Sequence, residues 1–285
     1  MINYFWLFLI IVLVTLQTVT KKSFNGKISG GAFTFSAAST FFALVFFLIT
    51  LPERFVFSTE YLPYSLAFAT TYSVCNIFTF LSLTAGPVSL TSLISSFSLL
   101  LPSVYGLAFL GENISAWIII GLVLLMISLV FINLENKGEE KKITLKWIIY
   151  VLISFFTNGC CSILQKVQQL NCDGLYKNDF MIVALIISTV VMFIAAFITE
   201  KKSVFQFLKK GIIPYSVCGI SNGAVNYLVI FLSLKMAASV MFPVISAGGI
   251  ILTLLLSIFL YKEKLSNNQI IGIIFGTLAV VFLNL

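Results

Sequence analysis

The chain has 285 residues, of which 60% are hydrophobic and 9% charged, and its formal net charge is +7 at pH 7. Soluble domains carry charge on about a quarter of their residues, so this composition excludes an ordinary aqueous protein and indicates an all-α integral membrane protein. The excess lysines lie in loops, where they can face anionic lipid headgroups. We therefore expect the lipid bilayer as a partner and no nucleic acid.

Ten apolar segments are long enough to cross a hydrocarbon core, which needs about 20 helical residues. They lie at residues 2–20, 31–51, 62–83, 88–110, 115–133, 145–165, 179–199, 212–234, 238–260 and 267–284. The first has no basic leader and no small-residue cleavage site, so we interpret it as a retained span. A charged stretch separates five spans from five and predicts a first five-helix repeat at 1–134, a linker at 135–146 and a second five-helix repeat at 145–285.

The second half of the chain repeats part of the first. Residues 63–134 recur as residues 214–285, with Pro-Tyr-Ser at 63–65 and 214–216. Because each repeat has an odd number of spans, the second copy must cross the membrane in the opposite sense. We therefore expect two inverted repeats, which are typical of secondary transporters. Lys and Arg concentrate in the odd-numbered loops, and the positive-inside rule then places both termini outside.

A Glu-x-x-Ser turn precedes the last span of each half, at Glu112 to Ser115 and at Glu263 to Ser266. Together with ten spans and the five-plus-five repeat, this turn resembles the drug/metabolite transporter superfamily, in its EamA-like branch. The resemblance covers essentially the whole chain. It implies a transporter fold with a cavity lined largely by spans 1, 3, 4, 6, 8 and 9, and cytoplasmic termini, opposite to the charge count. It does not specify the cargo.

The same turn invites a catalytic or coupling role, but a structural role is favoured. Ser115 and Ser266 can cap the next helix, and the acid upstream lies favourably against that helix's dipole.

Gly272 and Gly276 are spaced for close helix approach, either between the two halves or in a homodimer. Pro102 interrupts the fourth span and predicts a bend there.

No acid lies in the middle of a span, so a carboxylate proton relay has no obvious position. Lys166 and Lys235 lie at span ends, where we expect them to reach the headgroups. Phosphate and dicarboxylate solutes would then lack a partner at the midplane, and a neutral or zwitterionic solute fits better. Related small multidrug exporters carry an acid in their first span, where this chain has only Gln17.

Neutral hydrogen-bonding side chains in the spans are the candidates for substrate binding. They are Gln17, Tyr72, Asn76, Ser95, Asn158, Asn222, Asn226, Tyr227 and Ser246. Each asparagine could instead join two helices, for a net gain near 1 kcal/mol or less.

The chain has no histidine, and four of its five cysteines lie inside apolar runs. We therefore expect no metal site, no catalytic residue, no cofactor and no disulfide scaffold. Cys172 lies in a loop and should report sidedness to an impermeant thiol reagent.

These observations predict a multi-pass protein of the cell (cytoplasmic) membrane that transports by alternating access. The expected solute is a small neutral or zwitterionic metabolite such as an amino acid, moved outward by facilitated efflux. A nontransporting scaffold or regulatory protein is the main alternative. A membrane-embedded enzyme would need clustered titratable residues, which the spans do not offer, so no enzymatic activity is expected.

Overall fold

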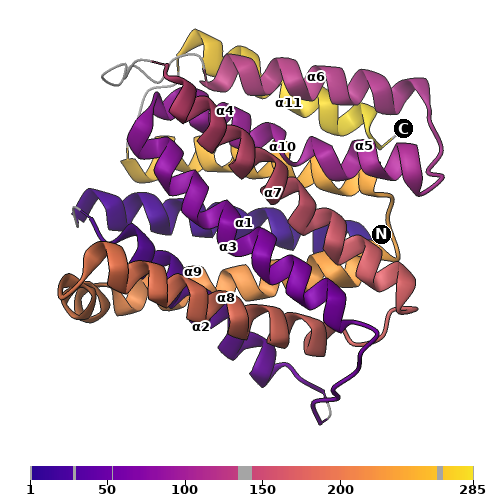
Figure 1. The fold of residues 1–285 in the computed structure, drawn as a ribbon. Helices are drawn as coiled ribbons and strands as arrows, with labels where there is room; N and C mark the ends of the chain where they lie inside the picture. The colour runs from indigo at the N-terminus through magenta and orange to yellow at the C-terminus, as the bar shows by residue number, and fades with distance from the viewer. Residues whose placement is uncertain (1, 28–29, 53, 134–142, 262–265, 285) are drawn as a thin grey trace. The chain divides into compact units, whose positions relative to one another are not determined.

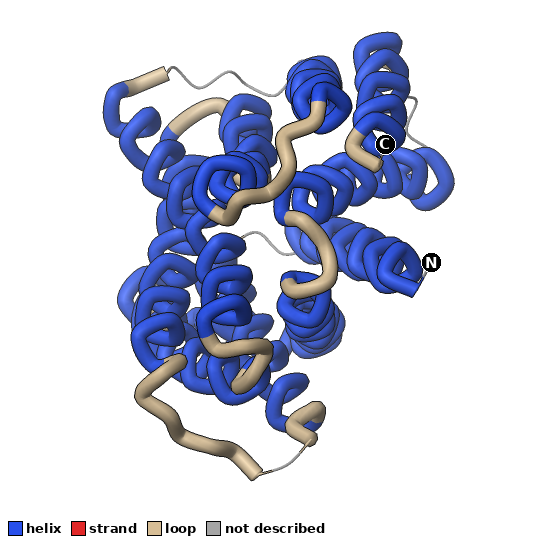
Figure 2. Tube along the Cα trace, turned by 90° about the vertical axis from the view of Figure 1, so that its right-hand side faces the viewer, coloured by secondary structure: helices blue, strands red, loops and turns tan. Residues whose placement is uncertain are grey.

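The computed structural model describes residues 2–27, 30–52, 54–133, 143–261 and 266–284. Within these ranges the chain is all-helical, with eleven helices and no strand (Figures 1 and 2). The helices are α1 (Ile2–Lys27), α2 (Ala32–Ile49), α3 (Leu62–Ala85), α4 (Val88–Phe97), α5 (Leu100–Phe109), α6 (Ala116–Asn133), α7 (Leu145–Asn171), α8 (Lys177–Glu200), α9 (Ser203–Ser233), α10 (Ala238–Tyr261) and α11 (Asn267–Phe282).

The helices pack into two compact units. Unit 1 contains Met1–Ser73 and Leu164–Lys235, and unit 2 contains Val74–Ile163 and Met236–Leu285. The boundaries fall inside α3 and α7, so each of these helices contributes one part to each unit. Each unit therefore combines helices from both halves of the sequence, and the packing units differ from the sequence repeats. Most of the predicted linker between the repeats lies outside the described residues.

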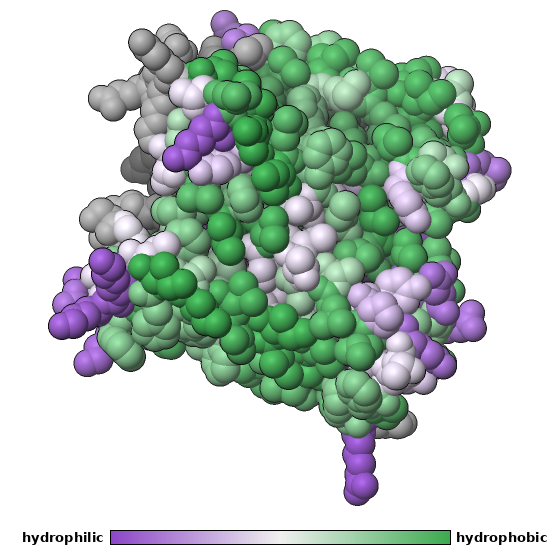
Figure 3. All heavy atoms as spheres, viewed as in Figure 1, coloured by the Kyte–Doolittle hydropathy of each residue, from purple (hydrophilic) through white to green (hydrophobic). Residues whose placement is uncertain are grey.

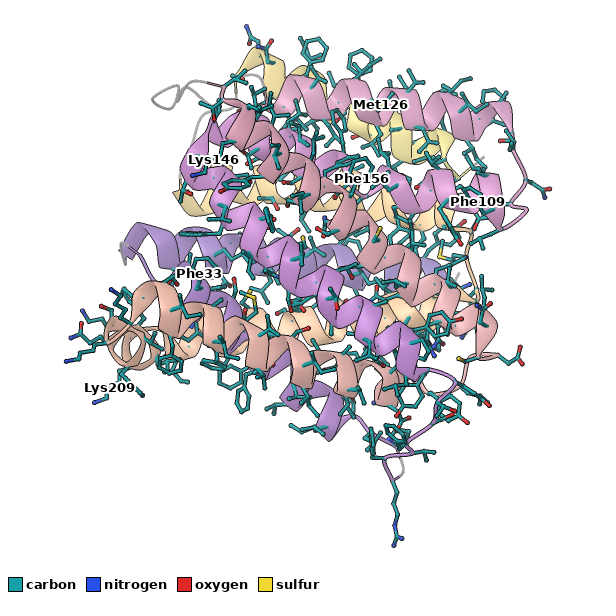
Figure 4. All side chains as sticks on the ribbon, in the orientation of Figure 1. Phe33, Phe109, Met126, Lys146, Phe156 and Lys209 are labelled. Atoms are coloured by element: carbon teal, nitrogen blue, oxygen red, sulfur yellow. The ribbon has the colours of Figure 1, made fainter. Side chains whose placement is uncertain are left out.

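Among the described residues, eight stretches are long and apolar enough to cross a membrane: the seven helices α1, α2, α3, α7, α8, α9 and α10, and the consecutive helices α4 and α5 taken together. Helices α6 and α11 are shorter and also apolar. Their outward surfaces are also apolar: Figure 3 shows hydrophobic residues over most of the face in view, with hydrophilic residues near helix ends. Phe109, Met126 and Phe156, labelled in Figure 4, are 75%, 43% and 55% exposed. Water would penalise so much exposed apolar surface, whereas lipid accepts it. The protein is accordingly a multi-pass membrane protein.

The fourth predicted span is two helices, α4 and α5, interrupted at Ser98 and Leu99. Pro102 explains the position of the break, because proline has no N–H and its ring clashes with the carbonyl four residues earlier, here that of Ser98. The amide of Leu101 instead donates to the Ser98 carbonyl in a tighter turn, at 3.1 Å. Pro243 lies inside α10 without dividing it.

In unit 2, α11 packs closely on α6, as the glycine spacing predicts. A Cβ added at Gly272 would lie 2.5 Å from Ile132 Cγ1, and one added at Gly276 would lie 2.8 Å from Ser128 Oγ. The Ser128 hydroxyl donates to the Gly272 carbonyl at 2.6 Å, which the short interhelical distance permits. The predicted close approach between helices of the two sequence halves is confirmed.

In unit 1, α2 packs against α8 and α9, and α1 packs against α9. Gly219 and Gly223, one turn apart on α9, let α2 come close: a Cβ at Gly219 would lie 2.3 Å from the Ser39 carbonyl oxygen. Phe24, Phe35 and Tyr215 form an aromatic core beside this contact. This packing fixes the rotation of α9 about its axis, and with it the direction of the polar residues that follow Gly219.

The serine caps predicted at the Glu-x-x-Ser turns are confirmed. Ser115 Oγ accepts from the Ile118 amide at 3.2 Å, and Ser266 Oγ accepts from the Gln269 amide at 3.2 Å. Gln269 Oε1 accepts in return from the Ser266 amide at 3.1 Å, which completes a capping box. The second acid of the motif, Glu263, lies outside the described residues.

Ser266→Ala should therefore lower stability by about 0.5–2 kcal/mol, the usual cost of losing such a cap. Thermal unfolding of the purified protein measures this effect. Asn267→Ala, at the exposed neighbouring position, is the matched control and should change the melting temperature little. Equal shifts in the two variants would contradict a capping role for Ser266.

The position of Glu112 differs from the prediction. Its carboxylate was expected beside the N-terminus of α6, but it accepts hydrogen bonds from the amides of Ala238 and Ser239, at 2.6 and 2.9 Å, and from Ser239 Oγ at 2.7 Å. It therefore caps α10, a helix distant in sequence. The negative charge of the Glu112 carboxylate is stabilised by the positive, N-terminal end of the α10 dipole.

A second carboxylate caps a helix in unit 1 in the same way. Glu200, at the end of α8, accepts from the amides of Phe33 and Thr34 at 2.9 and 3.0 Å and from the Thr34 hydroxyl. These contacts satisfy first-turn donors of α2, whose N-cap residue is a glycine without a side chain.

Candidate functional site

A continuous chain of amide side chains crosses unit 1. Gln165 Nε2 on α7 donates to Asn226 Oδ1 on α9 at 2.6 Å, Asn226 Nδ2 donates to Asn222 Oδ1 at 3.0 Å, and Asn222 Nδ2 donates to Gln17 Oε1 on α1 at 3.3 Å. We call these four residues the amide ladder. The structure thus brings together three predicted site residues, Gln17, Asn222 and Asn226, and adds Gln165, which sequence reasoning missed.

The ladder follows from helix geometry. Asn222 and Asn226 are four residues apart on α9 and therefore lie on one face. Gln17 and Gln165 are 8% and 3% exposed, and amides buried to this degree need hydrogen-bond partners. Among the described residues, neither Gln17 Nε2 nor Gln165 Oε1 has a protein partner. The ladder therefore ends in an available donor on α1 and an available acceptor on α7.

Lysine and aromatic side chains continue this polar face toward the C-terminal end of α9. Lys177 Nζ, at the start of α8, donates to the Tyr227 hydroxyl at 2.9 Å and lies 4.3 Å from the centre of its ring. Lys235 Nζ lies 3.5 Å from the centre of the Phe231 ring. Tyr227 and Phe231 are four residues apart on α9, which places them in one row, and Lys235 lies in the turn that follows the helix. Tyr227 was predicted as a site residue, whereas Lys177 was not.

Lys166 does not reach the headgroups as predicted. Its side chain is 6% exposed and is enclosed by unit 1, beside the ladder residue Gln165 in sequence. The prediction was wrong because the apolar run of the sixth span ends near residue 165, whereas α7 continues to Asn171 inside the protein. The buried Gln168 and Gln169 in this extension hold the following turn: Gln168 Nε2 donates to the Leu175 carbonyl at 3.2 Å.

The other predicted site residues belong to unit 2, apart from Tyr72, whose ring stacks on Phe68 in unit 1. Asn158 Nδ2 on α7 donates to Ser98 Oγ at 2.6 Å, at the interruption between α4 and α5. Ser95 and Ser246 carry buried hydroxyls with no partner among the described residues. Asn76 lies on the part of α3 that belongs to unit 2. The predicted set therefore divides between the units, and hydrogen bonds between described residues connect Gln17, Asn222 and Asn226 of unit 1.

A cavity of about 290 Å³ opens in unit 1 beside the start of α8. It is lined by Leu51, Pro52, Arg54, Val56, Gly174, Leu175, Tyr176, Lys177, Asn178 and Asp179. Lys177 belongs both to this lining and to the contact with Tyr227, so it connects the cavity to the α9 row. Small-molecule sites begin at about 300 Å³, so this cavity matches a small solute.

Cys172 is in the turn after α7, as predicted, but it is only 6% exposed. Burial raises the pKa of its thiol, and the nearby Glu60 and Asp173 charges act in the same direction, against a hydrogen bond with Gln168. A raised pKa leaves less thiolate at neutral pH, and the thiolate is the reactive form. Cys172 is therefore a poor sidedness probe.

In the described part of the chain, no three His, Cys, Asp or Glu residues are grouped to hold a metal ion.

An impermeant maleimide should therefore label a Thr59→Cys variant far faster than Cys172 at neutral pH, because Thr59 is exposed in the loop before α3. The rate at Cys172 should rise as the pH approaches its raised pKa. Labelling of intact cells and of inverted vesicles, followed by mass spectrometry, measures both rates and the side on which residue 59 lies. Rapid labelling of Cys172 at pH 7 would contradict its burial.

The model of the EamA-like transporter family matches residues 145–285. No curated protein matches the sequence. Among 28 matching chains of solved structures, one described only as "Crystal structure of protein" has a TM-score of 0.80 and 12% identity, covering 98% of this chain and 95% of that chain. At this identity the likeness shows a shared fold and no more. The second half of the chain, residues 145–285, thus matches the EamA-like transporter family, a family of membrane transporters within the drug/metabolite transporter superfamily.

Proposed function

We propose that the protein is a secondary transporter that exports a small neutral or zwitterionic metabolite, such as an amino acid, across the cytoplasmic membrane. Its ten spans would form two inverted five-helix repeats, residues 1–134 and 145–285, that alternate access to the solute. Facilitated efflux requires no titrating residue in the spans. The match of residues 145–285 to the EamA-like family supports transport in general, and the solute class rests on the polar residues inside unit 1.

The single observation that carries the proposal is the amide ladder. Two buried amides, on Gln17 and Gln165, and two half-buried ones, on Asn222 and Asn226, are aligned by one-directional hydrogen bonds, and such polar groups are costly to place in an apolar helical unit unless they have a use. Their open ends offer one donor, on Gln17, and one acceptor, on Gln165. A small polar solute can use both ends, whereas a lipophilic cation would find no carboxylate among the ladder residues.

Counterflow in proteoliposomes tests the proposal. The purified protein is reconstituted into vesicles preloaded with one unlabelled solute from a panel of amino acids, nucleosides, sugars and polyamines, and uptake of the labelled solute is followed. Protein-free vesicles give the background. Exchange of an amino acid above this background is the expected result. A folded, correctly inserted protein that exchanges none of the panel would favour a nontransporting scaffold.

A further inference from the structure

Exposed lysines gather at one end of unit 1. Because Glu200 at the end of α8 caps the first turn of α2, the end of α8, the start of α2 and the start of α9 lie together. Four exposed lysines occupy the turn between α8 and α9 and the first turns of α9: Lys201, Lys202, Lys209 and Lys210. Figure 4 labels Lys209 at this end, and Figure 3, in the same view, shows hydrophilic residues grouped there. We call these four residues the lysine face.

No acid neutralises the lysine face within the described part of unit 1. Its neighbour in the chain, Glu200, accepts instead from the amides of Phe33 and Thr34 and from the Thr34 hydroxyl. No described carboxylate forms a salt bridge with any of the four lysines. The other end of the unit carries both signs of charge in equal number among its described residues: Arg54, Lys177, Lys235, Glu60, Asp173 and Asp179. The positive potential of unit 1 is therefore concentrated at the lysine face.

The first turns of α9 have a buried side and an outward side. Val204 and Tyr215 are fully buried and lie about three helical turns apart, so they share one side. Lys202, Phe205 and Lys209 follow one another at the three- and four-residue spacing of a helix and are exposed, which places them together on the outward side. Charged and aromatic side chains therefore alternate on the surface that this part of α9 presents to its surroundings.

The position of the lysine face along α9 matches the edge of a membrane. On the outward side, the lysines are followed by Ile212 and Ile213, which are 52% and 72% exposed. Residues 212–233 alone are long enough, at about 1.5 Å per residue, to cross a hydrocarbon core about 30 Å thick. Residues 203–211 then extend about 13 Å beyond the core, into the layer that holds the phosphate groups of the lipids. The lysine face therefore lies at headgroup depth.

We propose that the lysine face is a binding surface for anionic phospholipids and selects them over zwitterionic ones. The ammonium groups take the phosphate with its uncompensated negative charge. The rings of Phe197 and Phe205, both exposed and 5.8 Å apart, lie beside these charges and contact the upper part of the acyl chains. A zwitterionic lipid carries its own cation next to the phosphate, so the lysines gain less from it. This binding does not depend on which solute the protein transports.

Two lipids with the same acyl chains test the selectivity. Thermal stabilisation of the purified protein in detergent is measured with added dioleoyl phosphatidylglycerol and with dioleoyl phosphatidylcholine. Phosphatidylglycerol should stabilise the wild-type protein at concentrations at least about tenfold lower, because each lysine near an anionic headgroup contributes about fivefold in affinity. NaCl at about 0.5 M should remove most of the difference, since it screens exposed charges. Equal stabilisation by the two lipids at low salt overturns the proposal.

Variants then assign the selectivity to the lysine face. Lys209→Gln combined with Lys210→Gln should reduce the preference for phosphatidylglycerol at least about tenfold, and Lys209→Arg combined with Lys210→Arg should keep it. Arg54→Gln combined with Lys235→Gln is the matched control, because it removes two exposed charges from the other end of unit 1 and should leave the preference unchanged. An undiminished preference in the Lys209 and Lys210 glutamine variant overturns the proposal. If that variant does not fold, the salt dependence of the wild type and the control variant decide.

A soluble anion distinguishes a lipid surface from a site for free phosphate. Inorganic phosphate and glycerol 3-phosphate, at the concentrations at which phosphatidylglycerol acts, should not stabilise the wild-type protein, because they lack the acyl chains. Equal stabilisation by either soluble anion would identify a free-phosphate site and overturn the proposal of a lipid surface. Counterflow is a separate measurement: selectivity for phosphatidylglycerol without exchange of any solute would support the lipid surface and refute transport.

Discussion

Replacing Asn226 with leucine is expected to reduce counterflow of the transported solute by about tenfold or more, because the Gln165 amide that offers an acceptor to the solute would lose the hydrogen bond that positions it, and about 1.4 kcal/mol of lost binding is tenfold. Asn226 stands in the middle of the amide ladder: it accepts from Gln165 and donates to Asn222. Removing it separates the open acceptor on α7 from the rest of the network. Initial rates of exchange, normalised to inserted protein, measure the effect.

The same substitution also affects stability, so the two effects must be separated. Leucine at 226 leaves the Gln165 amide buried without its partner, which costs about 1–3 kcal/mol, whereas replacing both partners by apolar groups is nearly neutral. The double variant Gln165→Leu with Asn226→Leu should therefore regain part of the thermal stability, since Asn222 Oδ1 still lacks its donor at position 226, and should remain inactive. Asn171→Leu, which removes an exposed hydrogen bond to Tyr64, is the control for the substitution itself. Recovery of exchange in the double variant would identify the ladder as a purely structural contact between helices.

The spans were predictable from the sequence because hydrophobic length is a strong signal, but the ends of the helices were not. The sequence from Lys201 to Lys210 is rich in lysine and lies outside any apolar window, yet α9 begins at Ser203 and carries the charged turns as its first part. The interruption at Ser98 was predictable only as a bend at Pro102. Its position depends on which carbonyl the proline ring displaces, four residues earlier.

The candidate site was predicted in part for a related reason. Asn222, Asn226 and Gln17 stood out because amides are rare inside apolar runs, and the structure connects them. Gln165 and Lys177 lie at predicted span ends, where polar residues are ordinary and carry no signal. Only the tertiary fold, which continues α7 into the protein and places the first turn of α8 beside Tyr227, gives them a role. Glu112 illustrates the same limit, since its partner helix is more than a hundred residues away.

Glu112→Ala should destabilise unit 2 by about 3 kcal/mol, because one carboxylate serves three donors and hydrogen bonds to charged groups contribute about 1.5–3 kcal/mol each. Ala238 and Ser239 are 1% and 0% exposed, so water cannot replace the lost acceptor at the first turn of α10. Thermal unfolding of the purified protein measures the loss. Glu112→Gln keeps one acceptor oxygen without the charge and should lie between the wild type and Glu112→Ala.

Three further variants locate the effect. Ser239→Ala removes only the hydroxyl contact and should cost about 1 kcal/mol, while Glu60→Ala, at an exposed acid, should leave the melting temperature unchanged. Glu200→Ala removes the equivalent carboxylate from the first turn of α2 and should destabilise unit 1 to a similar degree, since it too accepts from two amides and a hydroxyl. A melting temperature unaffected by Glu112→Ala would mean that α10 begins without this cap. In that case the acid of the Glu-x-x-Ser turn would act on its own helix, α6, as the sequence alone suggests.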